Sequence, residues 1–183
     1  MCIRDSVYTN YPTAELFING KSYGKQSKNN SSLKSRYRLM WMDAVYEPGE
    51  VKVVAYNKDG KAVAEKTVRT AGKPHHIELV SNRNELTADG KDLAYVTVKV
   101  VDKDGNLCPT DSRLIHFSVK GAGKFRAVAN GDPTNLEQFH LPKMHAFHGM
   151  LTAIVQAGEI AGDLVLTAKA SGVKTGTVHL QAK

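Results

Sequence analysis

The sequence predicts an all-β protein that folds as two tandem antiparallel β-sandwiches. The first observation behind this prediction is a strict alternation of residue character. In LAYVTVKVVD (93–102), LIHFSVK (114–120) and DLVLTAKAS (163–171), every second residue is apolar. Successive side chains of a strand point to opposite faces, so a period of two gives each strand one buried face and one solvated face. Antiparallel sheets commonly have this arrangement.

Two further observations concern the turns and the absence of helical patterns. The dipeptides Asn19-Gly20, Asp59-Gly60 and Asp104-Gly105 join or end apolar runs. Such pairs accept the positive φ angles of tight hairpins. No window of ten or more residues shows an apolar helical stripe. Short, regularly spaced strands at about seven per ~100 residues are typical of an immunoglobulin-like sandwich. The predicted fold is therefore two tandem immunoglobulin-like antiparallel β-sandwiches.

The boundary between the two sandwiches is expected near TAGKPHH. The run AVAEKTVRT (62–70) has the pattern of a last strand, and Pro74 cannot continue a ladder in the middle of a sheet. A new alternation then begins with HIELV (76–80). We therefore assign residues 7–72 to the first sandwich and 73–183 to the second.

The first six residues, MCIRDS, are interpreted separately. They show no alternation, no apolar segment and no cleavage-site pattern of a signal peptide. We interpret residues 1–6 as a non-native scar. Because VYTN (7–10) already has the character of a strand, we expect the natural chain to continue upstream.

Composition and charge exclude several functional classes. The chain is 42% hydrophobic and 23% charged, which suits a folded globule. The net charge of +7 is spread over the chain, with 12 Lys+Arg against 7 Asp+Glu in residues 1–72 and 13 against 11 in 73–183. Even the densest basic run, Lys34, Arg36 and Arg38, has no basic helix behind it. Nucleic-acid binding needs a patch that follows phosphates, so no such partner is expected. No run of 18 apolar residues predicts a membrane span.

The two cysteines predict no redox or nucleophilic site. Cys2 lies within the interpreted scar, and Cys108 precedes Pro109 without a histidine or second cysteine placed to activate it. We expect Cys108 to be an inert thiol. No cofactor is expected from the sequence.

The first sandwich carries several short motifs in a fixed order. They are Ala14 to Gly20 (AELFING), Trp41, Tyr46 to Gly49 (YEPG) and Thr70 to Gly72 (TAG). In this combination the region resembles a module that follows the catalytic barrel in bacterial glycoside hydrolase family 2 enzymes of the β-galactosidase type. That module has long been catalogued as a domain of unknown function.

The second sandwich resembles the C-terminal immunoglobulin-like domain of the same enzymes. The matching stretches are IELVSNRNELTADGKDLAYVTVKVVDKDGNLCPT, HFSVKGAGKF, ANGDP, AFHGMLTAIVQA and AGDLVLTAKASG. The resemblance implies a non-catalytic tail of a larger enzyme that hydrolyses a terminal β-galactoside or related glycoside. It also implies that the missing barrel is a partner, and it implies a periplasmic or secreted location. In that setting the two sandwiches would buttress the barrel, help to form an oligomer, or shape the substrate entrance.

No pair of carboxylates predicts glycosidase chemistry in this chain. Retaining glycosidases need two carboxyl groups about 5–5.5 Å apart. The resembled family uses two barrel glutamates, of which the acid/base follows an asparagine, and Asn84-Glu85 imitates that pattern. We interpret Glu85 instead as a polar loop residue without a partner carboxylate. Asp102 and Asp104 flank a turn, where aspartates normally bond to their own backbone. We therefore predict no catalytic residue.

Three histidines lie close together in sequence but do not predict a metal site. His140, His145 and His148 are spaced by five and three residues, and a strand would place the last two on opposite faces. Within the resembled pattern, Phe147 is interpreted as a core residue and Gly149 as the site of a bend or bulge. His75 and His76 are also expected to point in opposite directions. No metal ligand is therefore predicted.

Four residues remain as candidates for an interface or sugar contact: Trp41, Asn130, Gly131 and Asp132. The run NGDP (130–133) has the composition of a turn, whose polar groups could face the barrel or a neighbouring subunit. Trp41 is flanked by Leu, Met and Met, which favours a core position over a sugar platform or an interdomain contact.

The alternative function is a stand-alone immunoglobulin-like module that binds carbohydrate or a cell surface. Exposed aromatic residues on one sheet face would favour it. The sequence offers Tyr37, Tyr56 and Tyr95, which do not form a regular stripe.

Overall fold

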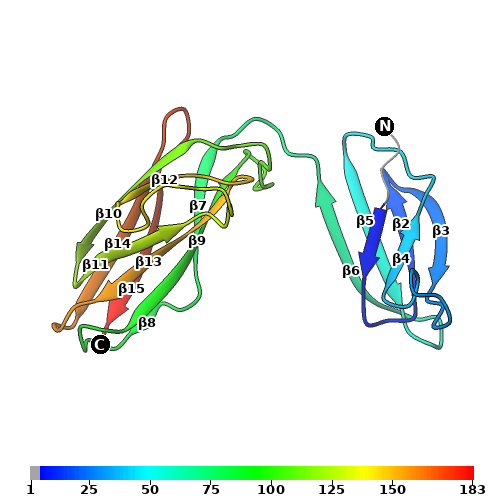
Figure 1. Ribbon diagram of the computed structural model, residues 1–183, viewed down its shortest axis with the longest axis horizontal. Helices are drawn as coiled ribbons and strands as arrows, with labels where there is room; N and C mark the ends of the chain where they lie inside the picture. The colour runs from blue at the N-terminus through cyan, green and yellow to red at the C-terminus, as the bar shows by residue number, and fades with distance from the viewer. Residues whose placement is uncertain (1–4) are drawn as a thin grey trace. The chain divides into compact units, whose positions relative to one another are not determined.

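The computed structural model describes residues 5–183, and these form two compact units with a boundary between Thr70 and Ala71. The described residues form strands, turns and bends, with no helix among them, so within this range no helix could cross a membrane. Figure 1 shows both units as layers of β-strands. The all-β fold of two immunoglobulin-like sandwiches is therefore confirmed.

The first unit contains six strands in two sheets. A four-stranded sheet has the order β3-β2-β5-β6, and a narrow sheet consists of β1 and β4 alone. Their bounds are β1 Asp5–Tyr8, β2 Thr13–Ile18, β3 Lys21–Ser27, β4 Arg38–Trp41, β5 Glu50–Tyr56 and β6 Ala62–Arg69.

The core of the first unit lies between these two sheets. Leu16 on β2 stands opposite Val53 on β5, and Leu39 and Trp41 reach the same core from β4. The narrow sheet has only two strands against four, and the residues of β6 are almost all exposed. Strand β1 begins at Asp5, so the first sandwich extends into the segment 1–6 that we had excluded from the fold.

The second unit contains nine strands in two sheets. One sheet has the order β12-β10-β14-β15-β8 and the other the order β11-β13-β9-β7. Their bounds are β7 His76–Ser81, β8 Glu85–Leu86, β9 Leu93–Val101, β10 Leu114–Gly121, β11 Gly123–Ala129, β12 Lys143–His145, β13 Met150–Ala157, β14 Gly162–Lys169 and β15 Gly176–Ala182.

The core of the second unit is built by the predicted alternation. Val98 on β9 lies between Leu151 on β13 and Leu79 on β7. Leu166 on β14, in the other sheet, belongs to the same apolar cluster. One pairing departs from the antiparallel prediction. Strand β15 pairs in parallel with the two-residue strand β8.

Candidate functional site

The turn Asn130–Asp132 satisfies its own polar groups. The Asn130 side chain donates to the backbone oxygen of His145 at 2.9 Å, and its Oδ1 accepts from the backbone N–H of Asp132 at 3.1 Å. The Asp132 carboxylate accepts two bonds of 2.8 Å from Thr134, one from the backbone N–H and one from the hydroxyl. These bonds lower the pKa of Asp132, the backbone N–H first. Gly131 supplies the positive φ of 78° that the turn requires. The arrangement is that of a self-contained turn.

The three nearby histidines lie in different environments. His145 Nδ1 lies 3.0 Å from Glu137 Oε1, whereas His148 Nδ1 lies 3.2 Å from the backbone oxygen of Pro109. His140 is exposed on the loop between β11 and β12. Among residues 5–183 no group of three or more His, Cys, Asp or Glu side chains is arranged to hold a metal ion.

The segment after β12 corrects the prediction for Phe147 and decides between the bend and the bulge that were expected at Gly149. Phe147 is only half-buried and packs on the ring of His148, so it is not the core residue that the sequence suggested. Ala146 and Met144 fill the core instead. Phe147 and Met150 exchange two backbone hydrogen bonds across His148 (φ 51°) and Gly149 (φ 74°). Two positive φ angles mark a tight hairpin turn of the primed kind rather than a bulge.

Glu85 occupies a surface position on the short strand β8 rather than the predicted loop. Its carboxylate pairs with the ammonium group of Lys183, and both side chains are exposed. The backbone oxygen of Asn84 accepts from the N–H of Gln181 as part of the parallel pairing with β15. These contacts connect the end of the chain to the sheet and give Glu85 a structural partner.

Cys108 is buried, and burial raises the pKa of its thiol, which keeps it protonated and unreactive.

His75 and His76 do not point apart: their Nδ1 atoms are 3.0 Å apart and their rings meet edge to face. The alternation argument failed here because β7 begins at His76, so His75 precedes the strand.

Trp41 belongs to the core of the first unit. Its side chain is 1% exposed, and its Nε1–H donates to the backbone oxygen of Gly24 on β3 at 2.9 Å. A ring enclosed in this way offers no face to a sugar, so the structure corrects the alternative of a sugar platform. The bond to Gly24 instead ties the narrow sheet to the edge of the larger one.

Three sequence motifs of the first unit meet in one hydrogen-bonded corner that we did not predict. Asn19 Oδ1 accepts from the N–H of Glu50 at 2.8 Å, and Asn19 Nδ2 donates to the oxygen of Pro48 at 3.2 Å. Thr70 Oγ1 accepts from the N–H of Gly49 at 3.0 Å and lies 3.1 Å from the hydroxyl of Tyr46. The AELFING, YEPG and TAG motifs are thus parts of one structural junction.

The second unit has a comparable junction at Asp102. This carboxylate is 2% exposed and accepts from the N–H of Gly72 at 2.7 Å, in addition to the N–H groups of Asp104 and Asn106 at 2.9 Å each. The bond from Gly72 is the main reason why the pKa of Asp102 lies well below its ordinary value. The sequence predicted the local turn bonds, but the bond across 30 residues to Gly72 was not foreseen.

An apolar groove of about 410 Å³ lies between β1 and β6 in the first unit. Its lining includes Val7 and Tyr8 from β1, Val53 from β5, and Ala64 and Val68 from β6. Val68 is 62% exposed, because the narrow sheet ends at β1 and leaves this strip uncovered. The groove is therefore an exposed apolar surface on the inner face of the larger sheet.

The three tyrosines of the alternative function lie in different environments. Tyr56 donates its hydroxyl to Glu15 at 2.9 Å and packs under Lys25, whereas Tyr37 and Tyr95 are exposed on different units. They do not form the common aromatic face that a sugar-binding stripe would require.

Family comparisons match both units. Residues 77–179 match the model for the glycoside hydrolase family 2 C-terminal domain 5. Residues 6–64 match a domain of unknown function, DUF4982.

Individual relatives match along almost the whole chain. A β-galactosidase of Bacteroides ovatus is 42% identical over 176 residues, which are 96% of this chain and 20% of the relative. Among solved structures, a β-glycosidase from Bacteroides vulgatus matches with a TM-score of 0.90 and 28% identity, covering 99% of this chain and 22% of that one. A family 2 glycosyl hydrolase from Bacteroides cellulosilyticus matches with a TM-score of 0.85 and 33% identity, covering 97% and 22%. The chain thus spans about a fifth of the length of these relatives.

Proposed function

Because the chain belongs to glycoside hydrolase family 2 through its C-terminal domain 5, we propose that it supports the catalytic barrel of a β-galactosidase-like enzyme without cleaving the glycosidic bond itself. The chain corresponds to the non-catalytic accessory region of such enzymes. The whole protein would hydrolyse a terminal β-galactoside or a related glycoside.

One observation carries this proposal. The similarity to the Bacteroides ovatus β-galactosidase extends over 96% of this chain but only 20% of the relative. The chemistry of a retaining glycosidase depends on two facing carboxyl groups. In this chain the glutamate that imitates the family's acid/base, Glu85, is paired with Lys183 on the surface. An accessory role fits both facts.

The apolar groove between β1 and β6 supports a partner for the first unit. Its exposed Val68 and Ala64 would lose water contact if the catalytic part of the enzyme packed on them. A second subunit or a carbohydrate would be a further partner in the same enzyme. The location we propose for the whole enzyme is the periplasm or the cell exterior, which the family resemblance supports.

A hydrolysis assay tests the absence of independent chemistry. The purified 183-residue chain should give no turnover of an aryl β-galactoside above the buffer rate, and Glu85→Gln should leave that result unchanged. Turnover by the isolated chain that disappears in Glu85→Gln would overturn the accessory role.

A replacement experiment tests the supporting role. The C-terminal fifth of the Bacteroides ovatus β-galactosidase would be exchanged for this chain, joined at the start of β1. We expect the chimera to retain activity and to unfold at a higher temperature than an enzyme that lacks the region altogether. Equal activity and melting temperature with and without the region would contradict the proposal.

A further inference from the structure

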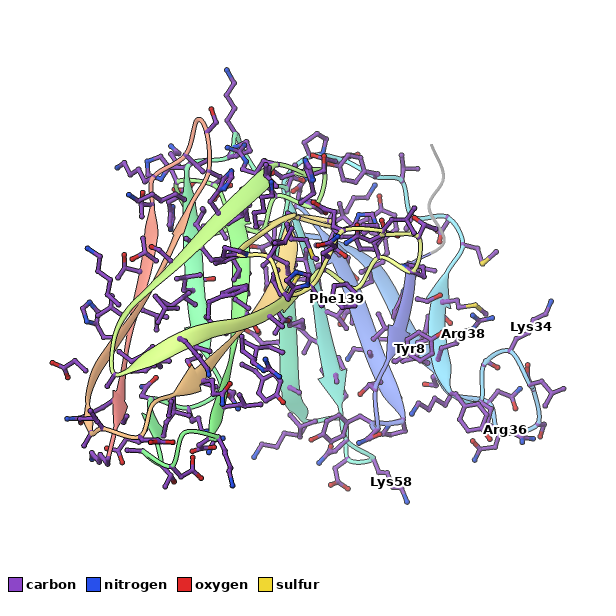
Figure 2. All side chains as sticks on the ribbon, turned by 60° about the vertical axis from the view of Figure 1, so that its left-hand side comes forward. Tyr8, Lys34, Arg36, Arg38, Lys58 and Phe139 are labelled. Atoms are coloured by element: carbon purple, nitrogen blue, oxygen red, sulfur yellow. The ribbon has the colours of Figure 1, made fainter. Side chains whose placement is uncertain are left out.

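The first unit carries a basic segment without acidic residues. Between Gly20 and Met42 the sequence has six lysines and arginines and no aspartate or glutamate. Three of the six cations, Lys34, Arg36 and Arg38, lie in or next to the loop between β3 and β4. Figure 2 shows Lys34 and Arg36 on this loop and Arg38 where β4 begins. The charged side chains of this segment are therefore all positive.

Each of the two arginines is held by one side-chain hydrogen bond, which its Nε donates. Arg36 Nε donates to the backbone oxygen of Asn30 at 3.1 Å, and Arg38 Nε donates to the backbone oxygen of Lys34 at 3.2 Å. Among the side chains of residues 6–183, neither guanidinium lies within ion-pair distance of a carboxylate, in contrast to Arg69, which pairs with Glu50. The terminal nitrogens of both arginines are thus available for an anion.

The loop itself is ordered by internal hydrogen bonds. Asn29 Oδ1 accepts from the N–H of Ser31 at 2.9 Å, and the N–H of Arg36 donates to the oxygen of Ser32 at 2.9 Å. The N–H of Asn29 donates to the oxygen of Ser35 at 3.3 Å, which closes the loop. Because the backbone is fixed, less conformational entropy is lost when the arginines bind a ligand.

Two exposed tyrosines flank the arginines. Tyr37, between them in sequence, is 66% exposed, and the Arg36 guanidinium lies 5.8 Å from the centre of its ring. Tyr8 is 71% exposed and stands directly opposite Arg38 in the pairing of β1 with β4, so both side chains lie on the outer face of the narrow sheet. Figure 2 shows Tyr8 and Arg38 next to each other. Neither tyrosine hydroxyl has a hydrogen-bond partner in the described part of the chain.

We propose that Lys34, Arg36, Tyr37, Arg38 and Tyr8, here called the Arg–Tyr patch, form a binding site for an acidic polysaccharide. The guanidinium groups would bind carboxylate or sulfate groups through paired N–H donors. The tyrosine rings would pack on the apolar faces of the sugar rings between those groups. The choice of a polysaccharide over other polyanions rests on the proposed function as part of a carbohydrate-active enzyme.

The test measures retardation of the purified 183-residue chain in native gels that contain one polymer each. Polyglucuronate provides carboxylates, dextran sulfate provides sulfate esters, and dextran is the neutral control. We expect retardation by one or both acidic polymers and none by dextran. The variant Arg36→Gln/Arg38→Gln should bind at least about tenfold more weakly, because it loses charge-assisted hydrogen bonds.

A matched control removes the same charge elsewhere. Lys124→Gln/Arg126→Gln changes two exposed cations on β11 of the second unit and should leave the affinity within about twofold of the unchanged chain, as expected for exposed cations that are not part of the patch. Tyr37→Ala and Tyr8→Ala keep the net charge and should each weaken binding severalfold, a result that charge alone does not give.

The outcomes separate the ligand chemistries. Binding to dextran sulfate alone supports the patch with sulfate as the recognised group, and binding to polyglucuronate alone supports it with carboxylate. Equal losses in the patch variant and the control variant, or tighter binding to a DNA oligonucleotide than to either polymer, would overturn it. Circular dichroism confirms that each variant is folded. The hydrolysis and replacement experiments test the accessory role without using the patch. A failure of the accessory role can therefore be told apart from a failure of polysaccharide binding.

Discussion

Gly49 shows how a single backbone position determines the junction of the first unit. It has a φ of 139°, and a Cβ atom at this position would lie 1.9 Å from Asn19 Oδ1. The same Asn19 oxygen accepts the N–H of Glu50. A side chain at position 49 therefore has both the wrong backbone conformation and no space, unless Asn19 gives up its bond.

We predict that Gly49→Ala destabilises the first unit by about 2–4 kcal/mol, because a strained backbone position costs about 1–3 kcal/mol and the loss of the Asn19 hydrogen bond adds about 1 kcal/mol. Gly60→Ala is the matched control, because Gly60 also has a positive φ, of 76°, but has nothing within 4 Å of the added methyl group. Its cost should be about 1–2 kcal/mol. Denaturant unfolding followed by the fluorescence of Trp41, the only tryptophan, measures both. Equal costs would contradict the role of the Asn19 contact.

Asp102 makes the second unit sensitive to acid. Its folded pKa is lowered, chiefly by the N–H of Gly72 and next by the side chain of Asn106. An unfolded aspartate has a pKa of about 3.9. A depressed folded pKa contributes stability that is fully present above the unfolded value and is lost as the pH falls through the folded value.

The measurement compares denaturant unfolding of the unchanged chain and Asp102→Asn between pH 6 and pH 2.5. We expect the substitution to destabilise the second unit at pH 6 and to reduce the additional loss of stability below pH 4. Asp104→Asn, in the same turn but exposed, is the control. Parallel pH curves for Asp102→Asn and the unchanged chain would exclude Asp102 as the acid-sensitive group.

At the scale of the element, strand β6 presents two different faces. Ala64, Lys66 and Val68 share the face that lines the apolar groove, while Val63 lies on the opposite face. Both valines are exposed in this chain, so replacing either should cost it little stability.

We predict that Val68→Lys and Val63→Lys have different effects in the chimera with the Bacteroides ovatus enzyme. Val68→Lys should lower the melting temperature of the chimera by several degrees, because a charge would be buried against the catalytic part. Val63→Lys should change it by about a degree or less, and both should leave the isolated chain unchanged. A chimera that tolerates Val68→Lys as well as Val63→Lys would show that the groove stays open to solvent.

The elements were largely predictable from sequence, and the contacts between them were not. Alternation located β9, β10 and β14 because their buried residues recur every second position. It failed at His75, and the family pattern failed at Phe147. Both residues lie outside regular strands, where neighbouring side chains are not constrained to opposite faces. The corner of Asn19, Gly49 and Thr70 escaped notice because its members are brought together only by the pairing of β5 with β2 and β6.

At the scale of the whole molecule, each unit has its own hydrophobic core. The second depends on its last strand, because β15 lies inside a five-stranded sheet between β14 and β8. Its residues Leu180 and Ala182 are buried in the core of that unit. Trp41 reports on the first unit alone.

We predict that a chain truncated after Thr175, which lacks β15, loses the fold of the second unit while Trp41 keeps the emission of a buried indole. Limited proteolysis should cut the truncated chain only within the second unit, at positions beyond Thr70. Removal of Lys183 alone is the control and should preserve both units. A red-shifted Trp41 emission in the truncated chain would show that the first unit cannot fold without the second.

The internal position of β15 also has a consequence for biosynthesis. A ribosome makes about 5–20 residues per second, and domains generally fold in the order in which they emerge. The first unit is complete once β6 has left the exit tunnel, whereas β8 and β14 wait for residues 176–182 before their sheet can close. For several seconds the nascent second unit exposes apolar strands, and chaperone demand during synthesis should therefore concentrate on this half of the polypeptide.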